Sequence, residues 1–313
     1  MTRTRSRVFA AAAVALAMLT VGTAAPATAA TGDPQPDGTM TPMIVGGQPA
    51  SQLYRGLGSL QYRRGDNPNF HECGVLLWDA RHAVTNAHCV TEYPTPTLED
   101  PRSFHIRFNS NDRLAGGIET GVWKTAVYPS WDWGAGTDLQ GDIAVLWLTK
   151  PVYTMPNILT PMAGLKRVPF GPARIAGWGY TSYPWDQPDA PQQLSELDTA
   201  IVDASHCAAA VIDAGEVCVA DLANPDTAAC FGDSGGPVMV RVPHLRSYWY
   251  LVGTASRETA VACAGPVVYT SVLYYRDWIN KTINGTYKHR GPSLPTRPTK
   301  PPEYRWAGCG TAC

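Results

Sequence analysis

From residue 44 onward the chain consists of short apolar runs separated by Gly, Pro, Asn and Asp, and this pattern restricts the fold more than any other feature of the sequence. The 29 glycines and 27 prolines favour many turns and little helix. The number and spacing of the runs predict an all-β sandwich or barrel, and the lack of strand–helix–strand alternation argues against a parallel sheet. The clearest runs are 58–62, 74–78, 104–108, 121–128, 143–148, 197–202, 237–242 and 248–255.

A single helix is predicted late in the chain, at 272–283. Its apolar residues recur at helical spacing, namely Val272, Tyr275, Trp278 and Ile279. The length of 313 residues allows one large or two small domains. With 16% charged and 44% hydrophobic residues, the composition is that of an ordinary globular protein. The formal net charge of −1 does not indicate a nucleic-acid partner or a membrane-surface partner.

The first thirty residues have the pattern of a secretory signal peptide. Arg3, Arg5 and Arg7 form a positive start, 8–21 is apolar, and small residues at 27–30 offer cleavage sites. An uncleaved membrane anchor is the alternative, but the apolar run is shorter than the ~20 residues that a span needs. The alanine-rich signal is typical of a bacterial protein of actinobacterial type. We therefore expect a secreted, extracellular, monomeric protein without a membrane span in its mature form.

Two further segments differ in composition from the globular part. Residues 31–43 are polar and contain three prolines, as in a short propeptide. Residues 288–313 form a proline-rich tail, which is typical of an extended linker. The tail is interpreted either as a tether or docking segment, or as a solvated end with a local Cys309–Cys313 bridge.

Eight cysteines are consistent with an oxidising, extracellular compartment. They form no CxxC pair, so a zinc site is not indicated, and no metal or cofactor is expected. Spacing alone leaves about 105 disulfide pairings open.

Three segments carry the residues for nucleophilic catalysis: 85–89 with His88, 141–145 with Asp142, and 230–237 with Ser234. A serine hydroxyl needs an adjacent imidazole to take its proton, and the imidazole needs a buried carboxylate to fix its tautomer and stabilise its charged form. The order His, Asp, Ser differs from the orders in subtilisins and α/β-hydrolases. Asp138 is a weaker candidate than Asp142, because an apolar strand that buries the carboxylate directly follows Asp142.

These segments resemble the chymotrypsin/trypsin family of serine proteases, and the resemblance covers 44–287. It implies two antiparallel six-stranded β-barrels followed by a C-terminal helix, with His88 and Asp142 from the first barrel and Ser234 from the second. It also implies an oxyanion hole made by the backbone N–H groups of Gly232 and Ser234. The implied disulfides are Cys73–Cys89, Cys207–Cys218 and Cys230–Cys263. Cys309 and Cys313 have no family counterpart and pair either with each other or between molecules.

The sequence Ile44-Val45-Gly46-Gly47 is a second family signature, and it implies a zymogen. In such enzymes, cleavage before the isoleucine frees an α-amine that pairs with the carboxylate next to the nucleophile, here Asp233. The alternative is that this segment is only a first strand. Because Met43 precedes the scissile bond, an enzyme of tryptic specificity would not activate itself, so a separate activating protease is expected.

The expected substrate pocket departs from that of trypsin. Six residues before the nucleophile, Ala228 stands where trypsin-like members have an aspartate. Val267 narrows the pocket, so small or medium-sized apolar side chains are expected at the cleaved bond. Glu258 would admit a basic side chain if it faced the pocket. Phe231 is expected at the pocket rim, and Ser256 is expected to donate a hydrogen bond to Asp142.

The sequence thus predicts a serine endopeptidase that acts on protein or peptide substrates. A non-catalytic, protease-like binding module is the main alternative, although such proteins usually lack a member of the triad. An esterase or lipase on another fold is the second alternative, and the β-rich pattern argues against it.

Overall fold

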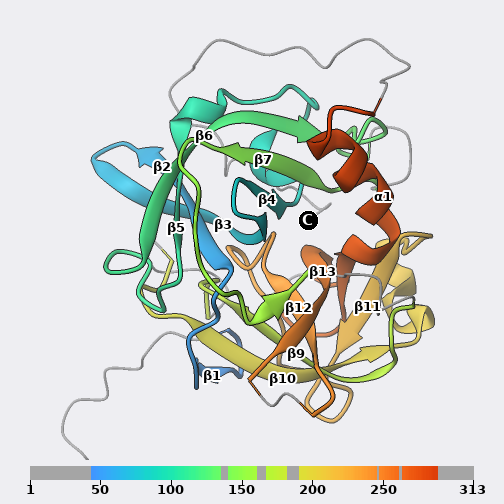
Figure 1. Ribbon diagram of the computed structural model, residues 1–313. Coiled ribbons are helices and arrows are strands. Elements are labelled where there is room, and N and C mark those ends of the chain that lie inside the picture. The colour runs from blue at the N-terminus through green and yellow to red at the C-terminus, as the bar shows by residue number, and fades with distance from the viewer. Residues whose placement is uncertain are drawn as a thin grey trace, which may run out of the picture. The chain divides into compact units, whose positions relative to one another are not determined.

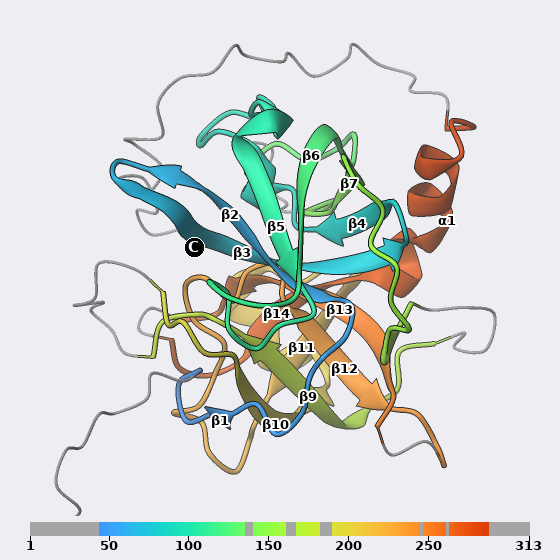
Figure 2. The ribbon, with the colours of Figure 1, turned by 60° about the vertical axis from the view of Figure 1, so that its left-hand side comes forward.

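The computed structural model describes residues 44–134, 140–160, 167–181, 190–244, 247–260 and 263–287. Six antiparallel strands of the N-terminal half close into a barrel, drawn in blue to green in Figures 1 and 2. Around the barrel they run β2 (Leu57–Arg64), β3 (Asn67–Asp79), β4 (His82–Thr85), β7 (Ala144–Leu148), β6 (Ile118–Val127) and β5 (Phe104–Phe108). Two short 3₁₀ helices, η1 (His88–Val90) and η2 (Pro101–Ser103), lie in the connection between β4 and β5.

Six strands of the C-terminal half form a second closed ring, because β9 pairs with both β10 and β12. In ring order these strands are β9 (Gly171–Gly177), β10 (Ser195–Val202), β11 (Glu216–Ala220), β14 (Val267–Ser271), β13 (Trp249–Glu258) and β12 (Pro237–Arg241). Two short strands add to this ring, β1 (Gln48–Pro49) on β10 and β8 (Ile158–Leu159) on β13. The 3₁₀ helix η3 (Ala204–Ala210) precedes β11. The expectation of two six-stranded barrels is confirmed.

Successive side chains of strand β7 point to opposite faces and so contact both halves of the molecule. All five of its residues are buried. Ala144, Leu146 and Leu148 belong to the core of the first barrel. Val145 and Trp147 point to the other face, as the period of two requires, and join a cluster that includes residues of the second half such as Leu251 and Trp278. The strand is therefore buried on both faces, which explains its uninterrupted apolar sequence.

The C-terminal helix α1 spans Val272–Ile283 and confirms the predicted helix. The side chain of Ser271 caps it by accepting a hydrogen bond from the backbone N–H of Tyr274. Its buried face consists of the residues that recur at helical spacing in the sequence: Val272, Tyr275, Trp278 and Ile279. These side chains complete the apolar cluster that β7 shares with β12 and β13.

Candidate active site

His88 and Asp142 form the centre of the site. His88 begins η1, and its Nδ1 lies 2.8 Å from Oδ2 of Asp142. The backbone N–H of His88 also donates to Oδ1 of Asp142, over 3.0 Å. Asp142 lies two residues before β7 and is only 1% exposed. The carboxylate thus fixes both the ring and the backbone of His88.

Two more side chains donate to the same carboxylate. The amide of Asn86 and the hydroxyl of Ser256 lie 2.8 Å and 2.7 Å from Oδ2 of Asp142. Burial by itself raises the pKa of Asp142, but the charge of protonated His88 and the hydrogen bonds from His88 and Ser256 outweigh burial and lower the pKa below its ordinary value. Asp142 is therefore ionised at neutral pH. Because Ser256 comes from β13, the second barrel takes part in holding a residue of the first.

Ser234 lies in the turn between β11 and β12 and is partly exposed. Its carbonyl oxygen accepts a hydrogen bond from the N–H of Gly74 in β3, over 2.7 Å. On the other side, the N–H of Gly235 donates to the carbonyl of Ala255 in β13, over 2.9 Å. Gly235 has a φ of +73°, and a Cβ there would overlap the carbonyl of Gly74 and the hydroxyl of Thr85. Both barrels therefore hold the peptide of Ser234, and only glycine fits directly after it.

Gly232 adopts a left-handed conformation, with a φ of +89°. Its carbonyl lies 2.8 Å from Nε2 of His71, whose Nδ1 lies 2.7 Å from the hydroxyl of Ser59. Since a carbonyl only accepts, Nε2 carries the proton and the Ser59 hydroxyl donates to Nδ1. This buried chain orients the peptide next to Ser234. His71 and Ser59 could not be predicted from the sequence, because a single histidine in a β-rich segment has no distinguishing pattern.

Asp233 is buried and accepts hydrogen bonds of 2.9 Å from the N–H groups of Gly179 and Cys230. A Cβ at Gly177 or Gly179 would overlap its carboxylate, so the surrounding backbone closes tightly on it. Burial raises the pKa of Asp233 to about 7. Ile44 is 1% exposed, and the next residue, Val45, pairs with Ala228 in a β-bridge.

The raised pKa of Asp233 predicts that the uncleaved chain loses stability as the pH rises. The pKa is about 7 in the folded chain, against an ordinary value of 3.8. Between these values the folded chain keeps a proton that the unfolded chain has released. The free energy of unfolding therefore falls between about pH 4 and pH 7, by on the order of 4 kcal/mol from this group. Urea unfolding at pH 5 and pH 8 measures the fall.

An Asp233→Asn variant is the control for this measurement. This variant removes the contribution of Asp233 to the fall in the free energy of unfolding. Burial also raises the pKa of Glu258 to about 7, so Glu258 still contributes to the fall. Asp142 changes the free energy of unfolding only below this pH range, because its pKa is lowered. Equal or greater stability of the uncleaved chain at pH 8 would contradict the prediction.

The residues expected in the substrate pocket lie close to one another. Ala228 and Val267 are buried and line one small cavity, together with Ile175 and Tyr269. Glu258 stands directly opposite Val267 in the β13–β14 pairing. Phe231 is half-buried and packs against the cluster that contains the Cys230–Cys263 disulfide.

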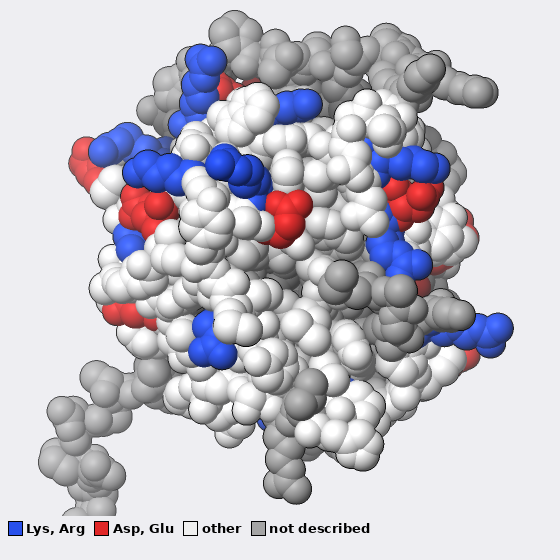
Figure 3. Space-filling model, in the orientation of Figure 1, with Lys and Arg blue, Asp and Glu red and all other residues white. Residues whose placement is uncertain are grey.

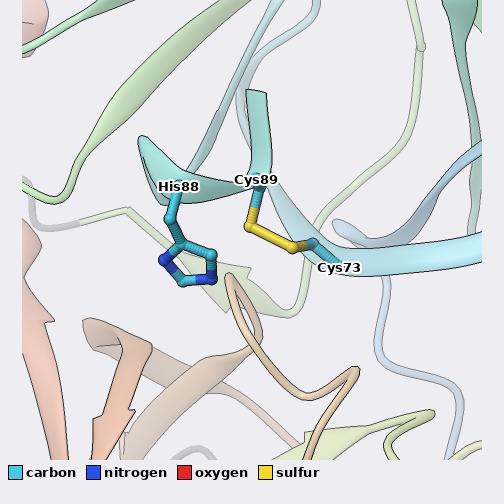
Figure 4. Close-up of side chains that lie close together, drawn as sticks. All are labelled: Cys73, His88 and Cys89. Carbon is cyan, nitrogen blue, oxygen red and sulfur yellow. A yellow bond between two sulfur atoms is a disulfide. The ribbon is translucent and has the colours of Figure 1, made fainter. Parts of the chain in front are cut away.

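The described part of the chain contains three disulfides: Cys73–Cys89, Cys207–Cys218 and Cys230–Cys263. They are the pairs that the family resemblance implies. The first one lies next to the catalytic candidate His88, as Figure 4 shows. Because both cysteines near His88 and both near Glu258 are in disulfides, neither group offers a thiolate to a metal. Asp138, Cys309 and Cys313 lie outside the described residues, as do segments 1–43 and 288–313.

An aromatic cluster flanks His88 and was not anticipated. The ring centroids of Trp131 and Trp133 lie 6.5 Å and 6.1 Å from the imidazole, and Tyr93 packs edge-on against Trp133 at 5.2 Å. The Trp-Asp-Trp sequence shortly before Asp142 is the local signal that marks it. Elsewhere, on the face in Figure 3, basic and acidic side chains are interspersed among uncharged residues.

Comparison with known proteins agrees with this geometry. The family model described as Trypsin matches residues 44–279. Chymotrypsin-like elastase family member 1 of Macaca fascicularis is 30% identical, over 72% of this chain and 83% of the relative. Human Testisin is 29% identical, over 78% of this chain and 79% of the relative. Rat Transmembrane protease serine 11G is 29% identical over 77% of this chain, and the match covers 55% of that relative's length.

These relatives are animal proteins, so they do not support the bacterial origin expected from the signal sequence. Two of the matched names refer to transmembrane proteases of the rat. Within the described parts of this chain, no helix has both the length and the apolar character that crossing a membrane requires.

Proposed function

Since the chain belongs to the trypsin family of serine-type endopeptidases, we propose that it is a secreted endopeptidase that hydrolyses peptide bonds in protein or peptide substrates. The observation that carries this proposal is the arrangement around His88. Asp142 is ionised, fixes the imidazole and receives donors from both barrels. No simple structural role explains a buried carboxylate that orients a partly exposed histidine.

In the proposed reaction, His88 Nε2 takes the proton of the Ser234 hydroxyl while Oγ attacks the substrate carbonyl. Asp142 stabilises the imidazolium that forms. The N–H groups of Gly232 and Ser234 stabilise the oxyanion, and Gly232 has the left-handed conformation that glycine adopts without strain. His88 then protonates the leaving amine, and water hydrolyses the acyl-enzyme by the reverse sequence of proton transfers.

The proposal includes a precursor. Residues 1–30 are the signal peptide, 31–43 the propeptide, 44–287 the peptidase domain and 288–313 a proline-rich tail. A separate protease cleaves before Ile44, and the new ammonium pairs with Asp233. The burial of Ile44 and the close backbone around the carboxylate support this step. A bacterial, actinobacterial-type origin rests on the signal sequence only.

The proposed pocket takes a small or medium-sized apolar side chain. Ala228 replaces the carboxylate that trypsin-like members carry, and Val267 occupies space with a branched side chain. Both residues are buried among apolar side chains of the second barrel, which supports this preference.

Covalent labelling with a fluorophosphonate tests the proposed chemistry. We expect the form that begins at Ile44 to be labelled, and mass spectrometry to locate the label on Ser234. The Ser234→Ala variant is the control and is expected to remain unlabelled. If the folded form that begins at Ile44 takes up no label, the proposal fails and a non-catalytic binding module is favoured.

A further inference from the structure

Glu258 is an acidic residue next to Val267, one of the residues expected in the substrate pocket. It ends β13 directly opposite Val267 of β14, so the two side chains share one face of the sheet. Its carboxylate lies within 4.8 Å of both sulfurs of the Cys230–Cys263 disulfide. We propose that Glu258 determines the specificity of the pocket and that its carboxylate binds the cationic end of a lysine or arginine side chain at the cleaved bond.

This inference rests on the proposed endopeptidase function and replaces the apolar preference of its pocket with a basic one. The apolar preference followed from Ala228, which stands where trypsin-like members have an acidic residue. Glu258 supplies a carboxylate from the side wall instead. The apolar surface of Ala228 and Val267 is then suited to the methylene stem of a basic side chain, whose charged end turns toward Glu258.

The hydrogen bonding of Glu258 is incomplete. The backbone N–H of Cys263 donates to the carboxylate. Oε2, however, is buried and has no hydrogen-bond partner among the described residues. A buried carboxylate oxygen without a donor is unfavourable, and an ammonium or guanidinium group from a substrate is the donor that it lacks.

The charged groups around Glu258 leave its negative charge uncompensated. Among the described residues, Asp233 is the charged group that acts on Glu258 in the uncleaved chain, and it is itself negative and offers no positive partner. Arg257, the preceding residue of β13, binds elsewhere. Its Nη2 lies 2.8 Å from Oε2 of Glu216, and its Nε donates to the carbonyl of Ala210 over 2.9 Å. The side chain of the substrate can therefore provide the positive charge that pairs with Glu258.

A pH dependence follows from this arrangement. Burial raises the pKa of Glu258 to about 7, so a proton competes with a cationic side chain below that pH. We expect the ratio of kcat/KM for a lysine substrate to kcat/KM for an alanine substrate to rise about tenfold per pH unit below pH 7 and to level off above it. Any effect of pH on His88 applies to both substrates and cancels in this ratio.

Two peptides that differ only in Lys or Ala at the cleaved bond test the proposal on the form that begins at Ile44. We expect Glu258→Gln to lower the Lys/Ala ratio of kcat/KM by about 30-fold or more at pH 8, because it removes a charge partner in a desolvated site. Glu258→Asp is expected to restore part of the ratio. Glu119→Gln is the matched control, since Glu119 lies on β6 of the first barrel with a 52% exposed side chain. This change is expected to alter the ratio less than about twofold.

The outcomes separate this inference from the proposed function. An enzyme that is labelled at Ser234 but has the same Lys/Ala ratio in the wild type and in Glu258→Gln overturns the role of Glu258 and leaves the endopeptidase in place. A chain that neither takes the label nor cleaves any peptide overturns the endopeptidase, and the role of Glu258 with it.

Discussion

An Asp142→Asn variant is expected to have a kcat about 10⁴-fold lower than the unchanged enzyme at neutral pH. In the structure, His88 Nδ1, Asn86 and Ser256 converge on Oδ2, and the backbone N–H of His88 meets Oδ1. An asparagine amide has one oxygen only. In either orientation its NH₂ group faces a donor, and the negative charge that stabilises imidazolium is lost.

Steady-state kinetics with a good peptide substrate, measured between pH 6 and pH 9, tests this prediction. The matched control is Asp277→Asn, because Asp277 lies on the outer face of α1 with a 78% exposed side chain and pairs with Lys281. That variant is expected to stay within about twofold of the unchanged enzyme. If the folded Asp142→Asn variant keeps more than a tenth of the kcat, Asp142 is not the carboxylate of the triad.

Removal of residues 31–43 is expected to raise kcat/KM by about 10²–10³-fold, the range associated with completing an oxyanion hole. In the uncleaved chain the nitrogen of Ile44 is an uncharged amide, so Asp233 is buried without a cation, and burial raises its pKa to about 7. The ammonium freed by cleavage supplies the missing charge, and ionised Asp233 then holds the neighbouring Gly232–Ser234 peptide in one conformation.

A precursor with a recognition sequence for a sequence-specific protease ahead of Ile44 allows both forms to be compared from one preparation. An Asp233→Asn variant, cleaved in the same way, is expected to show little of the increase, because asparagine cannot pair with the ammonium. Equal kcat/KM values before and after cleavage would rule out the zymogen. A full increase in Asp233→Asn would assign the activation to another contact.

Local sequence was enough to predict several elements of the fold. The stretch 104–108 alternates buried and half-exposed residues, and the structure forms β5 there with the same bounds. The helix at 272–283 was predicted from its apolar spacing, and its bounds agree with those of α1. These features depend on periods of two and 3.6 residues along one segment, so neighbouring residues alone determine them.

Contacts between distant segments could not be predicted in this way. The order of His88, Asp142 and Ser234 indicated a triad, but the hydrogen bond from Ser256 to Asp142 joins residues 114 positions apart and exists only because the two barrels meet there. The link from His71 to Gly232 spans 161 positions and left no pattern in the sequence.

Glu258 shows most clearly what only the tertiary structure decided. From the sequence alone, the direction of its side chain, toward the pocket or away from it, was open. In the structure the register of β13 shifts between Ala255 and Arg257, which pairs Glu258 with Val267 and brings its carboxylate to the Cys230–Cys263 disulfide. A shift of one residue would have turned the side chain to the other face. The sequence determined the type of chemistry through residue identity and order, whereas strand register and burial determined where each charge lies and how strongly it is held.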